Sequence, residues 1–65
     1  MDCEKTGKLI RRLRQEKGNT QAGLADRLHV SDKAVSKWER GLGCPDISLL
    51  PQLSALLGAE ISASF

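Results

Sequence analysis

Residues 20–41, TQAGLADRLHVSDKAVSKWERG, decide the fold of this chain. Their apolar side chains recur at helical spacing in two short groups. These are Leu24, Ala25 and Leu28 in the first group, and Val35 and Trp38 in the second. Between the groups, His29 can turn the chain, Val30 can fill the corner and Ser31 can cap the next helix. Two short amphipathic helices must therefore meet at an angle, as in a helix-turn-helix.

The outward face of the second predicted helix is cationic. Lys33, Lys37 and Arg40 stand at positions i, i+4 and i+7, so they share one face of a helix only about three turns long. Such a face suits the major groove of B-DNA, which admits one α-helix. An ordinary solvated helix also carries lysines, but here the cap, turn and core positions fall into register around the same face. This register favours DNA binding.

The same residues resemble a known family. Residues 21–40 are similar to the helix-turn-helix of the phage-repressor and Cro-like DNA-binding domains (XRE-like transcriptional regulators), and the resemblance runs from about Thr6 to Ile61. It rests on Leu13, Arg14, Gly18, Thr20, Gln21, Leu24, Ala25, Leu28, Val30, Ser31, the run VSKWERG at 35–41, Pro45, Asp46, Leu53, Leu56, Leu57 and Gly58. VSKWERG together with the upstream TQxxLA and the leucine-rich segment downstream makes the match specific.

The resemblance implies both a fold and a function. The fold is all-α, a compact lambda-repressor-like bundle of four to five short helices whose second and third helices form the helix-turn-helix. The function is sequence-specific binding of double-stranded DNA as the DNA-binding domain of a bacterial or phage transcriptional regulator. Residues 31–40 would be the recognition helix in the major groove. No cofactor is implied, and a homodimer on the operator remains open.

Individual residues take roles by the same resemblance. Ser31, Asp32, Lys33 and Lys37 fall on positions that read base edges, and Thr20, Gln21, Ser36 and Arg40 fall on positions nearer the phosphates. Lysine at 33 and 37 favours guanine O6 and N7. Asp32 either accepts from a cytosine amino group or serves only the first turn of its helix. Arg14 and Glu39 match a largely buried family ion pair, although a solvated Arg14 is the alternative.

Composition fits one small domain spanning residues 1–65. Sixty-five residues with 40% hydrophobic content and only two aromatic residues point to an aliphatic helical core. The net charge of +2 does not by itself establish a nucleic-acid partner. No histidine, cysteine and carboxylate set has catalytic or metal-ligand spacing, no phosphate-binding glycine loop occurs, and no small-molecule site is evident. We therefore expect neither an enzyme nor a metal site.

The two cysteines, Cys3 and Cys44, are far apart in the sequence and belong to no CxxC motif. This spacing predicts neither a disulfide nor a zinc site, and two free thiols fit a reducing cytoplasm. No apolar run approaches the roughly 20 residues of a membrane span, and the basic start lacks the apolar stretch of a signal peptide. The expected location is cytoplasmic, with no membrane contact from this chain.

Local signals place the helix ends. Residues 1–5 lack periodicity and are expected to form a disordered arm. A first helix runs over about 6–17 and stops at Gly18, and a second runs from a Thr20 cap to about 28. Its entrance departs from the family pattern, because Asn19 replaces an apolar staple residue and Gly23 replaces a capping-box glutamate.

Similar local signals place the helix ends in the second half of the chain. The third helix ends at Gly41, and Asp46 can cap a turn that leads into a leucine-rich helix ending at Gly58. Pro51 must lie in the first turn of that helix or at a step from 3₁₀ to α. Ile61 is expected to be the last packed residue, and residues 62–65 form a frayed tail.

The alternative function is a protein-interaction module on the same fold, antitoxin-like or subunit-docking, with little affinity for DNA. The small net charge, the cation-free segment LGCP at 42–45 and Asp32 favour it.

Overall fold

A computed structural model of the protein describes residues 2–58. Its elements, in chain order, are α1 (Cys3–Glu16), α2 (Gln21–Leu28), α3 (Asp32–Glu39), the 3₁₀ helix η1 (Ile47–Leu49) and α4 (Leu50–Leu57). Residues 2–58 contain no strand. The predicted all-α class and the helix-turn-helix formed by α2 and α3 are confirmed.

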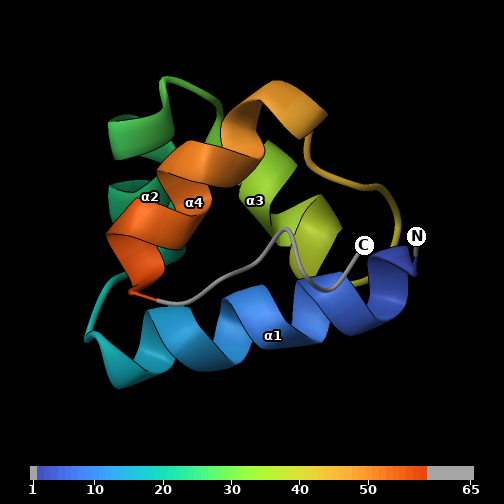
Figure 1. Cartoon of the computed structure of the whole chain (residues 1–65), viewed down its shortest axis with the longest axis horizontal. Helices are drawn as coiled ribbons and strands as arrows, with labels where there is room; N and C mark the ends of the chain where they lie inside the picture. The colour runs from blue at the N-terminus through green and yellow to red at the C-terminus, as the bar shows by residue number, and fades with distance from the viewer. Residues whose placement is uncertain (1, 59–65) are drawn as a thin grey trace.

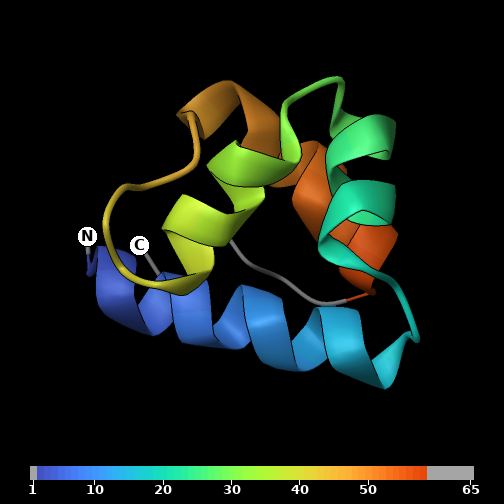
Figure 2. The same ribbon diagram turned by 180° about the vertical axis from the view of Figure 1, so that it is seen from behind.

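The helices enclose one core. α2 and α3 lie on one side and α4 on the opposite side, while α1 runs along the base beneath both (Figures 1 and 2). The buried apolar side chains are Ile10, Leu13, Leu24, Ala25, Leu28, Val35, Trp38, Leu50, Leu53 and Leu57. Every α-helix contributes to this set, so each buries the apolar stripe that its spacing predicts.

The prediction of a disordered arm over residues 1–5 is wrong for residues 2–5. α1 begins at Cys3 because Asp2, in extended conformation, accepts a hydrogen bond from the backbone N–H of Lys5 at 3.1 Å. Aspartate is a preferred N-cap residue, and this one extends the helix three residues beyond the predicted start at about Thr6. Met1 lies outside the described residues.

The turn between α2 and α3 has the predicted chemistry. Thr20 Oγ1 accepts from the N–H of Gly23 at 2.9 Å, and Ser31 Oγ accepts from the N–H of Ala34 at 3.2 Å. His29 adopts left-handed φ and ψ of 59° and 39°. Histidine tolerates this region better than most residues that carry a Cβ, so the chain can reverse here without glycine.

The start of α4 is also as predicted. Asp46 Oδ1 accepts from the N–H of Ser48 at 3.0 Å, and η1 passes into α4 with Pro51 in its first turn. That hydrogen bond lowers the pKa of Asp46 by stabilising its charged form, so the stabilisation is lost as the pH falls through the folded-state pKa. α4 ends at Gly58. The predicted packing of Ile61 and the predicted frayed tail, residues 62–65, lie outside the described residues.

Gly23→Glu is expected to stabilise the domain by about 0.5 to 1.5 kcal/mol. Gly23 is an exposed helical residue, where glycine costs up to about 1 kcal/mol relative to alanine, and glutamate there can close a capping box with Thr20. A Cβ at this position would lie 3.1 Å from Thr20 Oγ1, an exposed side-chain atom that can shift. Urea unfolding measures the change, and Gly23→Ala separates helix propensity from the capping box. A lower midpoint for both variants would mean that the Thr20 cap is lost.

Candidate nucleic-acid interface

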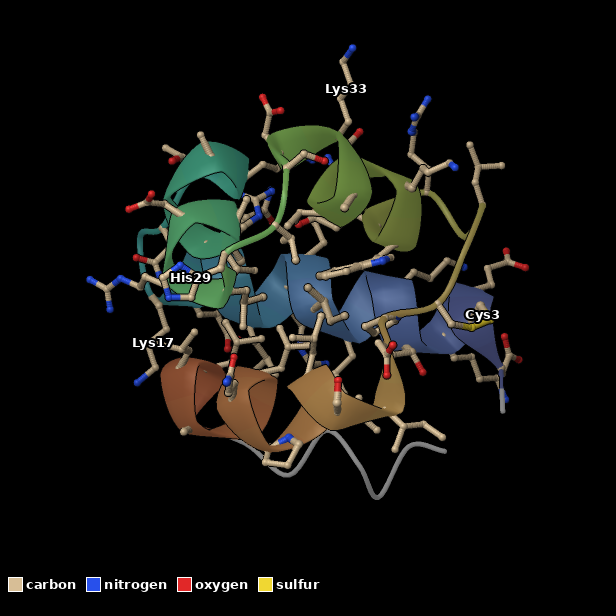
Figure 3. The ribbon with its side chains drawn as sticks, turned by 90° about the horizontal axis from the view of Figure 1, so that it is seen from above. Cys3, Lys17, His29 and Lys33 are labelled. Carbon is tan, nitrogen blue, oxygen red and sulfur yellow. A yellow bond between two sulfur atoms is a disulfide. The ribbon has the colours of Figure 1, made fainter. Side chains whose placement is uncertain are left out.

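The outer face of α3 is exposed and carries the predicted cations. Lys33, Lys37 and Arg40 are all exposed, and Figure 3 shows Lys33 projecting away from the body of the molecule. On the opposite side of the helix, Val35 is 0% and Trp38 is 6% exposed. The core therefore holds α3 so that its cationic face points outward.

An ion pair fixes the end of α3 to α1. Arg14 Nε donates to Glu39 Oε2 at 2.7 Å and Nη2 donates to Glu39 Oε1 at 3.0 Å, while Nη1 donates to the carbonyl of Asn19 at 2.9 Å. The two charged side chains are only 11% and 3% exposed. The hydrogen bond to Glu39 raises the pKa of Arg14 despite the opposing effect of burial. The predicted pair is present, so Arg14 is not a free surface cation.

Gln21 takes part in the same cluster, which the sequence did not reveal. Its Nε2 donates to Glu39 Oε1 at 3.1 Å, and its side chain is half-buried. This bond brings the first turn of α2 to the end of α3, beside Arg40. An amide nitrogen carries two hydrogens, so the second can still donate to a phosphate.

The remaining predicted residues lie on the same surface. Thr20 and Ser31 are exposed, and each hydroxyl oxygen accepts a capping bond, which leaves its O–H to donate. Ser36 is half-buried, and its carbonyl accepts from Arg40 Nε at 3.4 Å. Asp32 is exposed in the first turn of α3, a position that suits both of its proposed roles.

A glycine on α1 also positions α3, and it is not among the residues predicted from the sequence. A Cβ added to Gly7 would lie 1.8 Å from the carbonyl oxygen of Trp38, so the two helices pack backbone against backbone. The available signal was its spacing: Gly7 precedes Ile10 by three residues and so falls on the core stripe. A glycine inside a helical pattern at such a place marks a close approach.

The prediction of free thiols is wrong. Cys3 and Cys44 form a disulfide, with Cα atoms 5.1 Å apart. The first turn of α1 lies beside the loop that follows α3, so a separation of 41 residues in sequence is closed in space. The cysteine spacing carries no information about that closure, because helix packing produces it.

No helix within residues 2–58 is long and apolar enough to cross a membrane. The described residues also contain no group of three or more histidine, cysteine or acidic side chains arranged to hold a metal ion.

Comparison with known proteins agrees with this geometry. A helix-turn-helix family model matches residues 10–63. The HTH-type transcriptional activator BcrR of Enterococcus faecalis is 40% identical over 52 residues, which are 80% of this chain and 26% of BcrR. The chain thus spans about a quarter of that relative.

Two solved structures share the fold. The clp gene regulator ClgR of Corynebacterium glutamicum has a TM-score of 0.86 and 32% identity, covering 97% of this chain and 67% of ClgR. The restriction-modification controller protein C.AhdI of Aeromonas hydrophila has a TM-score of 0.83 and 30% identity, covering 98% of this chain and 97% of C.AhdI. This chain therefore belongs to the phage-repressor and Cro-like helix-turn-helix family of DNA-binding domains.

Proposed function

We propose that this domain binds specific sites on double-stranded DNA as the DNA-binding part of a transcriptional regulator. The observation that carries the proposal is the exposed row Lys33, Lys37 and Arg40 on α3, a helix whose other face is fixed in the core. The names of the three similar proteins describe regulators or a controller protein, which agrees with this role. We assign no catalytic activity to the chain and place its action in the cytoplasm, where bacterial DNA lies.

The dimensions of α3 suit the major groove. An α-helix with its side chains is about 10 to 12 Å across, close to the groove's width of about 12 Å, and the eight residues of α3 rise about 12 Å along the helix axis. The ion pair of Arg14 with Glu39 and the backbone contact of Gly7 hold the far end of α3 on α1. The groove-facing side chains thus stand on a rigid element, which precise base readout requires.

The proposed roles divide along α3. Lys33 and Lys37 donate to guanine O6 and N7, with Ser31 and Asp32 at the adjoining base pairs. Thr20, Gln21, Ser36 and Arg40 hold the phosphates. Gln21 and Arg40 lie at the same end of the helix-turn-helix, because Gln21 bonds to Glu39.

The test is selection of bound sites from a random duplex pool at near-physiological salt, followed by binding of variants to the selected site. Lys33→Ala and Lys37→Ala are expected to relax base preference at particular positions by about 1 to 3 kcal/mol. Arg40→Ala should weaken binding to all sequences alike and reduce the salt slope by about one. Two half-sites about 10 base pairs apart, related by two-fold symmetry, would indicate that the domain binds as a dimer.

Lys17→Ala is the matched control. It removes the same charge at an exposed position, and Figure 3 places Lys17 beside α4, on the side away from Lys33. The DNA affinity and base preference of the Lys17→Ala variant should equal those of the unmodified protein. DNA affinity that is insensitive to salt, or unchanged by the triple substitution Lys33→Ala, Lys37→Ala and Arg40→Ala, would support the protein-interaction module instead.

A further inference from the structure

The disulfide joins α1 to the loop that leaves the recognition helix. Cys3 is the first residue of α1, and Cys44 lies in the loop between α3 and η1 (Figure 3). Both cysteines are half-buried, so part of each residue is open to solvent. Neither cysteine belongs to the closed core, and such a partly exposed setting is typical of redox-responsive cysteines.

The same loop touches α1 at a second point. Gly41 has a φ of 74°, and a Cβ on it would lie 3.3 Å from Glu4 Cα, so only a residue without a side chain fits well between α3 and α1. Leu42, the next residue, is 64% exposed. The loop between Glu39 and the buried Pro45 is thus attached to α1 by the close approach of Gly41 and by the disulfide.

Backbone hydrogen bonds connect this loop to the last turn of α3. The N–H of Leu42 donates to the carbonyl of Lys37 at 3.0 Å, and the N–H of Gly41 donates to the carbonyl of Trp38 at 3.1 Å. This pair of bonds is a Schellman motif, which closes the last turn of a helix. Arg40 lies within that turn. The Arg14–Glu39 pair and the Gly7 contact keep Trp38 and Glu39 on α1 in either redox state. A loop that is free to move away from α1 would therefore loosen the residues that follow Glu39, beginning with the cap residue Arg40.

The compartment in which the domain acts indicates whether the disulfide is permanent or reversible. Thiols in the cytoplasm are kept reduced, and cytoplasmic disulfides in most organisms are transient or redox-sensing. A domain that binds cellular DNA works in this compartment. A disulfide beside its recognition helix is therefore better explained as a reversible state than as a permanent crosslink.

We propose that Cys3 and Cys44 form a redox switch in which the oxidised, disulfide-bonded domain binds its DNA site more tightly than the reduced domain. This inference rests on the proposed function. The oxidant is a low-molecular-weight disulfide. One cysteine thiolate attacks it, forms a mixed disulfide and releases one thiolate. The second cysteine thiolate then attacks the mixed disulfide and releases the other. The two protons lost by the cysteines are taken up by the two released thiolates, and a dithiol reverses the exchange.

The expected effect follows from the position of Arg40. In the reduced form the segment that follows Glu39 is less fixed, so Arg40 at its start holds its phosphate for a smaller fraction of the time. Affinity for the selected duplex should fall about three- to tenfold on reduction, and the slope of log K against log salt should decrease in magnitude by about one. The thermal midpoint should fall as well, because the disulfide restricts the unfolded chain.

The experiment uses the full chain with the selected duplex. Protein reduced with dithiothreitol is compared with protein reoxidised by oxidised glutathione, and alkylation followed by mass spectrometry counts the thiols. Two alkylated cysteines are expected in the reduced form and none in an oxidised monomer. Binding is measured over a range of salt, at a temperature where circular dichroism shows both forms folded.

Two variants isolate the mechanism. Cys3→Ser combined with Cys44→Ser should bind like the reduced protein and ignore the redox treatment. Arg40→Ala should bind weakly in both forms and lose most of the redox response, because the contact that the switch controls is already absent. The effects of reduction and of Arg40→Ala are thus expected to be non-additive.

Equal affinities and salt slopes for the two forms would overturn the switch, as would tighter binding by the reduced form. Thiols that remain alkylatable after oxidation, or a disulfide found only between two chains, would also overturn it. If the oxidised protein, the reduced protein and the double serine variant all leave the duplex pool unbound while folded, the proposed function itself fails. If all three proteins instead bind the duplex equally, the switch fails but the proposed function stands.

Discussion

Arg14→Met is expected to destabilise the domain by about 3 to 5 kcal/mol, the cost of removing one partner from a buried ion pair. Glu39 is 3% exposed, and without Arg14 the one hydrogen bond that its carboxylate keeps from residues 2–58 is that from Gln21. Glu39→Leu should lie toward the lower end of that range, since Arg14 is 11% exposed and retains the carbonyl of Asn19. A domain of this size has a total stability of roughly the same magnitude, so either variant can unfold it.

Replacing both residues should recover much of the loss. Arg14→Met with Glu39→Leu removes both buried charges together and fills the space with apolar atoms, which is often neutral or stabilising. A double-mutant cycle followed by urea unfolding measures the coupling between the two side chains. If a single variant is too unstable for its urea unfolding to be measured, the whole cycle is repeated in the stabilised Gly23→Glu background.

An exposed pair on α1 provides the matched control. Lys8 Nζ lies 3.8 Å from Glu4 Oε1, and the two side chains are 74% and 71% exposed. Lys8→Met should change stability by only a few tenths of a kcal/mol, because water already solvates both charges. Effects of Arg14→Met and Glu39→Leu that are equally small and additive would contradict a buried pair, and would return Arg14 to the surface cations available for phosphate.

Gly7→Ala is expected to destabilise the domain by about 3 kcal/mol or more, through overpacking. The added Cβ would lie 1.8 Å from the oxygen and 2.8 Å from the carbon of the Trp38 carbonyl. Both are backbone atoms, so no side chain can rotate away. α1 must instead move off α3, and this movement disturbs Trp38 in the core and Glu39 in its ion pair.

The measurement compares two glycine-to-alanine variants on helices. Gly23→Ala, at an exposed position in α2, should raise the thermal midpoint, whereas Gly7→Ala should lower it strongly or leave no cooperative transition in circular dichroism. The two substitutions are chemically identical and make the same change in helix propensity, so the difference between their effects reports on packing. A Gly7→Ala protein that melts at the temperature of the unmodified protein would show that α1 and α3 are not in backbone contact.

The sequence by itself determined the helix-turn-helix and the orientation of its recognition helix. Thr20 and Ser31 begin helices and Gly58 ends one, through hydrogen bonds and backbone angles that involve only a few neighbouring residues. A single sequence is therefore enough to predict these helix ends. The 3.6-residue period likewise assigned Val35 and Trp38 to the core and the cations to the outside. The start of α1 is also locally encoded, since Asp2 caps it, but the cap lies outside the apolar stripe, so apolar periodicity alone does not reveal it.

Only the tertiary structure decided which distant residues meet. The pairs Cys3 with Cys44, Gly7 with Trp38 and Gln21 with Glu39 join segments that are far apart in the chain. Their contacts depend on the angles and distances at which α1, α2 and α3 pack. Many small van der Waals terms across the whole core set those angles, and no short motif encodes them. The pair of Arg14 with Glu39 is of the same long-range kind, and only the family resemblance made it predictable.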